Sequence, residues 1–298
     1  MPRIICAGLI AVDLVFEVSH MPAKGTKNRA STSRMIPGGG SLNAALAIAG
    51  LGGQVSLCGA VGDDVFGQFL RQRMRDRGID DVLVSTMTEM PTSRSAIIIT
   101  PDGDRSIINH RETGLAPASV ALPTDFPFDA ALVDTRWPAA AAEIVKAARH
   151  AGKPAVIDAE APVANARKAL SAASHVVFSE QGLADFCGAA GPDCLAQASA
   201  RLGCWCAVTR GAASVLCHDG AQMTEVPTFK AKPLNTLGAG DAWHGAFTLS
   251  LAQGRSELDA VQWANAVACL KVGRSIHDEE MPTAQDVARF LNAPPGSV

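Results

Sequence analysis

One carboxylate follows a run of small residues where a loop leads into a predicted helix. The stretch covers residues 235–246, Asn-Thr-Leu-Gly-Ala-Gly-Asp-Ala-Trp-His-Gly-Ala, and Asp241 falls in the first helical turn. Small residues at Gly238, Ala239 and Gly240 let the backbone approach a ligand closely, and amides at a helix start attract an anion. A carboxylate there suits a general base that deprotonates a hydroxyl while the amides hold phosphoryl charge. The alternative is a structural helix start, with glycine for packing and aspartate for the dipole.

A second glycine run precedes another predicted helix. Gly38, Gly39 and Gly40 are followed by Asn43, and this Ala-rich segment ends at Leu51–Gly52. The glycines permit close contact with a polyol, and the amide of Asn43 can donate and accept hydrogen bonds to neighbouring hydroxyls. No strand is followed by G-x-G-x-x-G, and no Walker A pattern occurs. The run therefore favours a hydroxyl-bearing ligand, with a flexible loop before a helix as the alternative.

Alternating strand-like and helix-like segments position both stretches. Short apolar runs predict buried strands, and the Ala-rich or amphipathic segments between them predict helices. The predicted strands are 3–9, 54–60, 130–133, 153–157, 176–179 and 207–209, and the predicted helices are 41–51, 64–77, 139–151, 165–173, 183–188, 240–253 and 257–272. This alternation predicts an α/β fold with a doubly wound, mostly parallel sheet flanked by helices. Ligands of such sheets bind beyond the carboxyl ends of the strands.

Two segments interrupt the alternation. Residues 15–36 contain short polar strands around a Lys-Gly-Thr-Lys turn, and residues 93–110 predict a hairpin with its turn at 101–103, Pro-Asp-Gly. We expect them to form a small antiparallel sheet that covers one end of the main sheet. The sequence thus predicts one domain over residues 1–298, with a β lid inserted as about 14–37 and 93–111.

Composition excludes several classes of function. The chain has 26 Lys and Arg against 29 Asp and Glu, a net charge of −3, and aromatic residues make up 5%. Nucleic-acid binding needs a basic surface or stacking rings, so we expect no nucleic-acid partner. No apolar run reaches the roughly 18 residues of a membrane span, so we expect no membrane partner either. Eight scattered cysteines without a C-x-x-C pair predict reduced thiols and a cytoplasmic location.

Together the two glycine stretches resemble the signatures of the ribokinase-like carbohydrate kinases, the PfkB family. The first signature matches residues 38–52, and the second, usually D-T-x-G-A-G-D, matches residues 235–241. The resemblance extends to Asp13 after the first strand, to G-A-V-G-D-D-V-F-G at 59–67 and to V-T-R-G at 208–211. It implies a ribokinase-like α/β core with a small lid, and an enzyme that transfers the γ-phosphoryl group of ATP to a sugar with Mg²⁺.

The resemblance also assigns roles to single residues. It makes Asp241 the catalytic base, beside an anion hole formed by the amides of Leu237, Gly238, Ala239 and Gly240. It assigns the sugar to Asp13, Gly39, Gly40 and Asn43, and the nucleotide to Thr209, Gly211, Glu180 and Asn265. The implied partners are therefore a small sugar and ATP, and we expect a homodimer formed through the lid.

Three family features differ in this sequence. Asn235 stands where the second signature opens with Asp, and the N-x-x-E motif associated with Mg²⁺ and phosphate appears as Ser-Glu-Gln-Gly at 179–182. Gly182 therefore occupies the position of the motif's Glu, and we interpret Glu180 as taking part of that role. The loop that binds a monovalent cation is not recognisable near residues 273–278. No residue is assigned directly to a metal.

Local motifs resemble one branch of the family, the bacterial sulfofructose kinases. They are S-A-I-I at 95–98, I-I-N at 107–109, D-T-R-W at 134–137, F-S-E at 178–180 and W-H-G-A at 243–246. Arg136 follows a predicted strand, and Asn109 and Lys27 fall on predicted lid strands. Such side chains can hold a sulfonate through charge-assisted hydrogen bonds. We therefore expect C1 of 6-deoxy-6-sulfofructose to be phosphorylated.

Other interpretations stay open. Lys27 is alternatively a solvated lid charge, and Arg136 alternatively pairs with Asp134 or Asp158. The enzyme is alternatively a kinase of a neutral or carboxylated sugar, such as ribose, fructose or 2-keto-3-deoxygluconate. A nucleoside kinase and a non-catalytic sugar-binding protein are further alternatives. The intact Asp241 argues against a silent protein, and the scarcity of aromatic residues at the sugar end argues against a pocket for a base.

Overall fold

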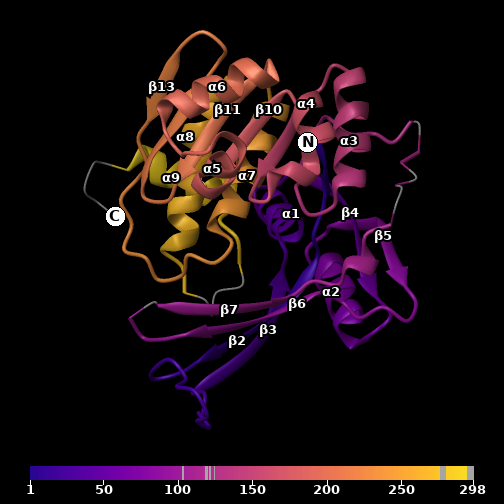
Figure 1. The fold of residues 1–298 in the computed structure, drawn as a ribbon, viewed down its shortest axis with the longest axis vertical. Coiled ribbons are helices and arrows are strands. Elements are labelled where there is room, and N and C mark those ends of the chain that lie inside the picture. The colour runs from indigo at the N-terminus through magenta and orange to yellow at the C-terminus, as the bar shows by residue number, and fades with distance from the viewer. Residues whose placement is uncertain (103, 118–119, 121, 124, 276–279, 294–298) are drawn as a thin grey trace.

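Two β-sheets organise the chain (Figure 1), which the computed structural model describes except at residues 103, 118–119, 121, 124, 276–279 and 294–298. The large sheet has the strand order β13-β12-β11-β10-β9-β8-β1-β4-β5. Its strands are β1 Arg3–Ala7, β4 Gln54–Gly62, β5 Asp80–Met87, β8 Ala130–Asp134, β9 Ala155–Ala159, β10 His175–Ser179, β11 Trp205–Arg210, β12 Ala213–His218 and β13 Met223–Val226. From β5 to β11 neighbouring strands pair in parallel, and β12 and β13 extend that edge antiparallel.

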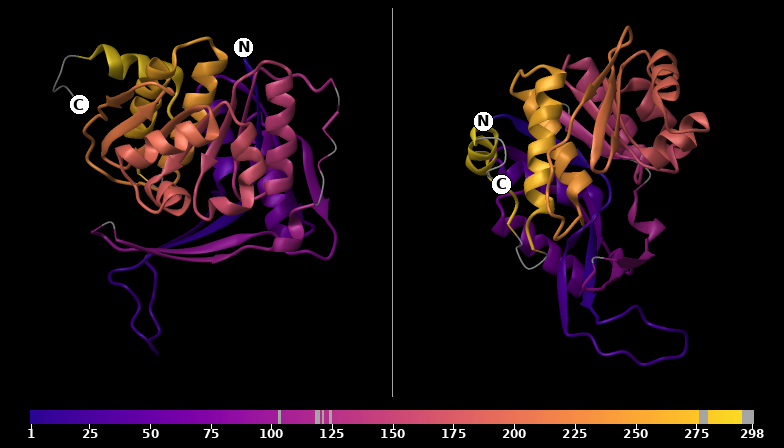
Figure 2. Two further views of the ribbon diagram at one scale, coloured as in Figure 1. Left: turned by 45° about the horizontal axis from the view of Figure 1, so that its top comes forward. Right: turned by 90° about the vertical axis from the view of Figure 1, so that its left-hand side faces the viewer.

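Helices cover both faces of this sheet (Figure 2). One face carries α1 Gly40–Gly50, α2 Val65–Asp76, α7 Ala239–Ala252, α8 Glu257–Val272 and α9 Ala284–Asn292. The other carries α3 Pro138–His150, α4 Arg167–Ala172, α5 Glu180–Cys187 and α6 Pro192–Leu202, with short 3₁₀ turns at Thr113–Leu115 and Val163–Ala166. The predicted doubly wound, mostly parallel α/β fold is confirmed.

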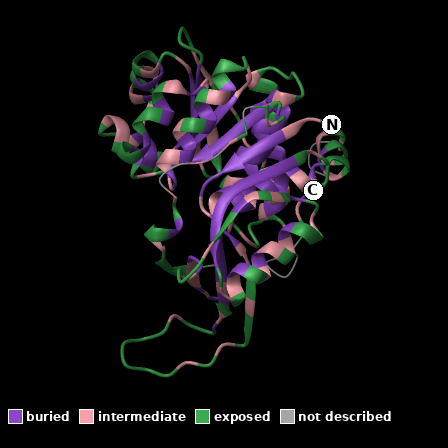
Figure 3. Ribbon diagram, turned by 90° about the vertical axis from the view of Figure 1, so that its right-hand side faces the viewer, coloured by how far each residue is buried: buried purple, intermediate pink, exposed green. Residues whose placement is uncertain are grey.

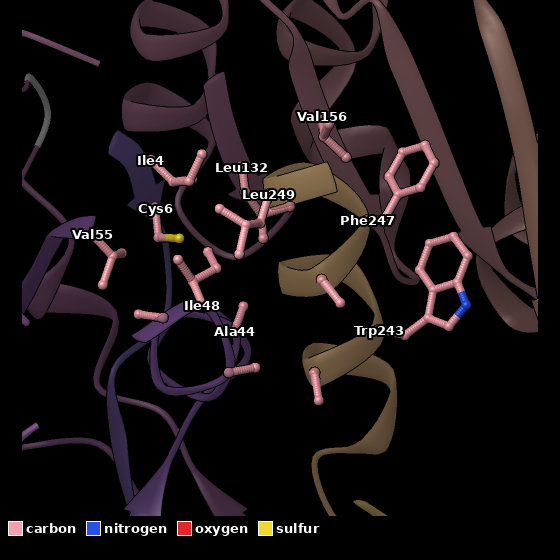
Figure 4. Packing of buried hydrophobic residues seen from close by; sticks show 14 of the residues in the cluster. Ile4, Cys6, Ala44, Ile48, Val55, Leu132, Val156, Trp243, Phe247 and Leu249 are labelled. Carbon is pink, nitrogen blue, oxygen red and sulfur yellow. The ribbon is translucent and has the colours of Figure 1, made fainter. Parts of the chain in front are cut away.

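The buried sheet separates two hydrophobic clusters because successive side chains of a strand point to opposite faces. In β1, Ile4 and Cys6 pack with α1 and α7, whereas Ile5 and Ala7 pack with the helices of the other face. Figure 4 shows Ile4 and Cys6 beside Ile48 of α1 and Leu249 of α7. This packing fixes the starts of α1 and α7 side by side, which brings the two glycine stretches together.

The small sheet lies across one end of the large sheet (Figure 1). Its order is β3-β2-β6-β7, with β2 at Ala11–Glu17, β3 at Thr32–Gly38, β6 at Arg94–Ile99 and β7 at Arg105–His110. The two hairpins are antiparallel, but β2 pairs with β6 in parallel, so the expectation of a wholly antiparallel sheet was wrong. The expected turn at 101–103 includes residue 103, which lies outside the described residues.

The connection between β2 and β3, residues 18–31, leaves the body of the protein as a long loop. Figure 3 shows it at the lower edge of the molecule, largely exposed, whereas the strands of the large sheet are buried. Lys27 is exposed within this loop and is not on a strand, so its predicted place on a lid strand was wrong. The polar sequence of this segment carries no alternating apolar residues that would hold it against the sheet.

Candidate active site

The carboxyl ends of β1 and β8 form the topological switch point of the large sheet. From β1 the chain builds outward through β4 and β5, whereas β8 begins the series that continues to β11. Asp134 ends β8 and accepts hydrogen bonds from the Leu9 amide at 2.8 Å, the Ser41 hydroxyl at 3.0 Å and the Arg136 amide at 2.8 Å. A pocket opens between this edge and the small sheet, where ligands of such folds bind.

The two glycine stretches meet at this pocket. The side-chain amide of Asn43, in the first turn of α1, donates to Oδ2 of Asp241, in the first turn of α7, at 2.8 Å. Gly39 precedes α1 with a φ of +89°, and a Cβ there would lie 2.4 Å from the carbonyl oxygen of Leu9. Only glycine therefore fits this turn, and the turn places Asn43 within hydrogen-bond distance of Asp241.

Three carboxylates converge around Gly40. A Cβ built on Gly40 would lie 3.4 Å from Oδ1 of Asp241, 3.8 Å from Oδ2 of Asp134 and 4.0 Å from Oδ2 of Asp158. Asp134 and Asp158 are register partners at the ends of β8 and β9. Burial raises the pKa of Asp241 to about 7, and the neighbouring Asp158 adds to the rise. Asp241 is therefore poised to gain and lose a proton near neutral pH.

His244 lies about one turn after Asp241 on α7. Its Nδ1 is 2.8 Å from the carbonyl oxygen of Gly240, and its Nε2 is 3.5 Å from Oδ1 of Asp158. Nε2 of His244 and Oδ1 of Asp158 are both buried, and neither has a hydrogen-bond partner within the described residues. Burial lowers the pKa of His244 and raises that of Asp158. Burial thus opposes the charged form of each group, next to Asp241.

The loop before α7 carries the backbone amides that were predicted to form the anion hole. The first hydrogen bond of the helix runs from the Ala242 amide to the Gly238 carbonyl at 2.9 Å, so earlier amides of that turn have no partner in the helix. The Leu237 amide donates to Oδ1 of Asn235 at 3.0 Å and the Ala239 amide to the Thr236 carbonyl at 3.4 Å, so these two predicted anion-hole amides already have acceptors in the protein. Asn235 supplies the same oxygen acceptor as the usual Asp, so this substitution preserves the turn.

The structure places most of the predicted sugar ligands in this pocket. Its lining includes the previously assigned Asp13, Gly39, Gly40, Asn43, Asn109, Arg136, Gly238 and Asp241. Burial raises the pKa of Asp13 on β2 to about 6. Oδ1 of Asn109 on β7 accepts from the Ser95 hydroxyl of β6 at 2.9 Å. Lys27 does not belong to this lining, because it lies in the loop between β2 and β3.

The side chain of Arg136 makes no hydrogen bond or ion pair with Asp134 or Asp158, the two acids suggested by the sequence. Its Nη2 lies 2.7 Å from Oε2 of Glu160, and its Nη1 donates to the carbonyl oxygen of Ala161 at 2.8 Å.

The pocket also contains residues that sequence reasoning missed, namely Arg94, Arg111, Asp158 and Glu160. A signal existed for the two acids, which follow the predicted strand 153–157. No local pattern distinguished the two arginines from ordinary surface charges.

The predicted nucleotide residues lie at the next strand ends. Ser179 and Thr209 are register partners on β10 and β11, and Gly211 forms the following turn with a φ of +60°. Glu180 is exposed in the first turn of α5. Asn265 is buried, and its amide accepts from Nε1 of Trp243 at 2.7 Å and donates to the Pro227 carbonyl at 3.1 Å. Both the oxygen and the nitrogen of the Asn265 side-chain amide are therefore hydrogen-bonded to protein groups.

The missing Glu of the N-x-x-E motif has a structural reason. A Cβ on Gly182 would lie 1.8 Å from the carbonyl oxygen of Ala159, so no side chain fits at this position. Among the described residues, no three or more His, Cys, Asp or Glu side chains gather in a metal-binding arrangement. Glu180 is the acidic residue of that turn, and a magnesium ion held with the phosphates of ATP needs only one or two carboxylates. Much of the region expected to bind a monovalent cation, residues 276–278, lies outside the described residues.

These features are typical of one class of protein, the α/β phosphotransferases: a buried carboxylate with a raised pKa lies in the first turn of a helix, at a pocket beside the strand ends. Residues 1–284 match the family model described as "pfkB family carbohydrate kinase". The chain belongs to this family. It is an ATP-dependent carbohydrate kinase with a ribokinase-like fold, and ATP with Mg²⁺ is its phosphoryl donor.

Similar proteins cover almost the whole chain. A ribokinase of Bacillus subtilis is 28% identical over 297 residues, which are 97% of this chain and 100% of that protein. An ATP-dependent ribose-1-phosphate kinase of Halopiger xanaduensis is 25% identical, with 98% and 99% covered. The crystal structure of a candidate ribokinase from Agrobacterium tumefaciens superposes with a TM-score of 0.93 at 30% identity, covering 98% and 99%. None of the helices in the described part of this chain has the length and apolar character of a membrane span.

Proposed function

We propose that this kinase phosphorylates the C1 hydroxyl of an anionic ketose, with 6-deoxy-6-sulfofructose as the substrate. One observation carries the proposal: the pocket that contains Asp241 also contains guanidinium groups, among them Arg136, and the Asn109 amide of the lid. A sulfonate accepts charge-assisted hydrogen bonds on three oxygens, and arginine suits such groups. A neutral sugar offers these guanidinium groups no counter-charge.

In the proposed reaction Asp241 takes the proton of the C1 hydroxyl. The amides of Gly238, Ala239 and Gly240 hold the charge that develops on the transferred phosphoryl group. Asn43 orients Asp241 through its hydrogen bond, and the buried Asp13 contributes to sugar binding from β2. Gly39 and Gly40 leave the space that the sugar occupies beside the three carboxylates.

The nucleotide approaches from the ends of β10 and β11 in this proposal. Thr209, Gly211 and Glu180 lie at that edge, and Asn265 shapes the protein behind it through Trp243. Mg²⁺ bound to ATP neutralises phosphate charge, and Glu180 is the side chain placed to hold it. The small sheet acts as a lid, inserted as residues 14–37 and 93–111 of a single domain spanning 1–298. Eight free thiols support a reducing compartment such as the cytoplasm.

Steady-state kinetics of the purified enzyme with MgATP test the substrate. We expect kcat/KM for 6-deoxy-6-sulfofructose to exceed kcat/KM for fructose and for ribose by at least about 10-fold, the effect of one charge-assisted contact. Product analysis should place the phosphate on C1. A higher kcat/KM for fructose or ribose would overturn the proposal.

Ribose is the second candidate, favoured by the similarity to proteins named ribokinase. The same kinetic panel separates the candidates, because a ribokinase would use ribose best and gain nothing from a sulfonate. One relative is named for an anionic sugar, ribose 1-phosphate. Ribose 1-phosphate therefore belongs in the panel as a second anionic acceptor.

We also propose a homodimer formed through the lid. Asp13, Ser95 and Asn109 face the pocket, so their strand neighbours face away from it. On that outer face Phe16 and Met35 are each 37% exposed, and Ile108 is 66% exposed, as a patch that a second lid can cover. Sedimentation should show a dimer for the wild type and a monomer for Ile108→Glu. A wild-type monomer would overturn this proposal.

A further inference from the structure

Three arginines line the sugar pocket, and their surroundings differ. The guanidinium of Arg94 lies over the Phe66 ring, 5.6 Å from its centroid. Arg136 is tied to Glu160 and to the Ala161 carbonyl, and its side chain is only 16% exposed. Its charge is therefore largely compensated before any substrate binds. Its hydrogen bonds make it part of the pocket wall, since they connect the end of β8 to the segment after β9.

Arg111 lies beside it, directly after β7. It lines the same pocket, is exposed, and has no hydrogen bond or ion pair within the part of the chain that the structure describes. Partial burial lowers the pKa of Arg111, and the adjacent Arg136 adds to this effect, whereas Glu160 and Asp134 oppose it. The guanidinium remains charged in water because an arginine pKa lies far above neutral pH.

We propose that Arg111 is the residue that selects an anionic substrate, by binding the sulfonate or an equivalent oxyanion at the end of the sugar farthest from Asp241. This inference rests on the proposed function and assigns its specificity to a different residue. Arg136 then acts as a positioning residue that shapes the wall around the anion.

The charges of the pocket support this assignment. Asp134, Asp158 and Asp241 surround Gly40, so an anionic group is repelled from the reacting end. Arg136 has Glu160 as a partner, whereas Arg111 has no ion pair among the described residues. Arg111 also borders a second hollow lined by Leu115 and Trp137, so its side chain has room to turn toward a ligand. A planar guanidinium can bind two oxygens of a sulfonate at once.

Substitution of each arginine separates the two roles. For Arg111→Gln we expect kcat/KM with 6-deoxy-6-sulfofructose to fall by about 10–100-fold, while kcat/KM with fructose changes by less than about threefold. Arg136→Gln should lower kcat/KM for both sugars, because it breaks the wall beside Glu160. Arg111→Lys keeps the positive charge but loses the planar pair of N–H donors. It should therefore keep only part of the preference for 6-deoxy-6-sulfofructose over fructose.

A binding measurement without ATP gives an independent readout. Calorimetric titration with 6-deoxy-6-sulfofructose should show weaker binding to Arg111→Gln than to the wild type, with fructose binding unchanged. Equal losses for both sugars in Arg111→Gln would overturn the role of Arg111 while the proposed function stands. A wild type that prefers fructose would overturn the proposed function itself. Folding is a minor concern, because the exposed Arg111 side chain makes no hydrogen bond to any residue that the structure describes. Arg111→Met provides a second neutral variant.

Discussion

At the scale of single residues, the carboxylate of Asp241 is the proposed catalytic base. Replacing it with Asn keeps the shape and an oxygen acceptor for the Asn43 amide, but removes the base. We expect kcat of Asp241→Asn to fall by roughly 10²–10⁴-fold, the usual contribution of general-base catalysis, with sugar affinity retained. Kinetics and sugar titration measure the two effects separately. Near-native turnover would exclude Asp241 as the base.

The same substitution has a predictable effect on stability. Burial raises the pKa of Asp241 from its ordinary 3.8 to about 7, so the folded chain binds this proton more tightly than the unfolded chain. Ionisation as pH rises from about 4 to about 7 therefore lowers the free energy of unfolding. Asp241→Asn removes this loss, and its Tm at pH 8 should equal or exceed that of the wild type. A clear drop in Tm at pH 8 would contradict this account.

Asp158 tunes the base without contacting it by a hydrogen bond. Its charge is, after burial, the next largest cause of the raised pKa of Asp241. In Asp158→Asn the pKa of Asp241 should therefore fall, and the acidic side of the kcat/KM profile should move to lower pH. Glu160→Gln removes a smaller contribution and should move the profile less in the same direction. An unchanged profile in Asp158→Asn would mean that burial alone sets the proton affinity.

The sequence predicted those pocket residues whose position is fixed by a local sequence pattern. Glycine runs before helices identified Asn43 and Asp241 because a helix start fixes where its first turn points. Lys27 and Arg111 show the limit of such patterns. Whether a lid charge reaches the pocket depends on the long loop between β2 and β3 and on the register of β6 with β7, which no local spacing encodes.

At the scale of elements, α5 shows why a family motif is absent. The Gly182 amide donates to the hydroxyl of Ser179, the N-cap residue, and the helix start lies against β9 so closely that a Cβ at 182 would overlap the Ala159 carbonyl. Gly182→Glu should therefore not recreate the motif but destabilise the fold, by about 1–3 kcal/mol or more. Gln181→Glu, an exposed change in the same turn, is the matched control and should leave Tm nearly unchanged. A stable, more active Gly182→Glu would show that the helix start can shift.

Sequence periodicity predicted elements unequally well. The helix 257–272 was predicted with its observed bounds, because apolar spacing and the Ser256 cap agree. The strands β5, β12 and β13 and the helices α6 and α9 were missed. β5 is an edge strand with few buried residues, and β12 and β13 are added antiparallel to β11, beyond the βαβ series. Edge elements give a weak signal because only part of each is buried.

At the scale of the whole molecule, one contact joins the lid to the anion-binding loop. Nη1 of Arg105 on β7 donates to the hydroxyl of Thr236 at 2.5 Å, across 131 residues of sequence. Thr236 directly precedes the segment that carries the amides of Gly238 and Gly240. This contact connects the small sheet to the proposed phosphoryl site, so we expect closure of the proposed lid over the sugar and alignment of the proposed anion hole to occur together.

A double-mutant cycle tests this connection. Arg105→Ala and Thr236→Val should each raise KM for the sugar several-fold with little change in Tm, because an exposed hydrogen bond contributes on the order of 1 kcal/mol. If the two side chains act through one another, the double variant should be no worse than either single variant. Hydrogen exchange should also show that sugar protects residues 94–102 and 104–110 less in Arg105→Ala than in the wild type. Additive losses, or unchanged protection, would mean that lid and loop respond to the sugar independently.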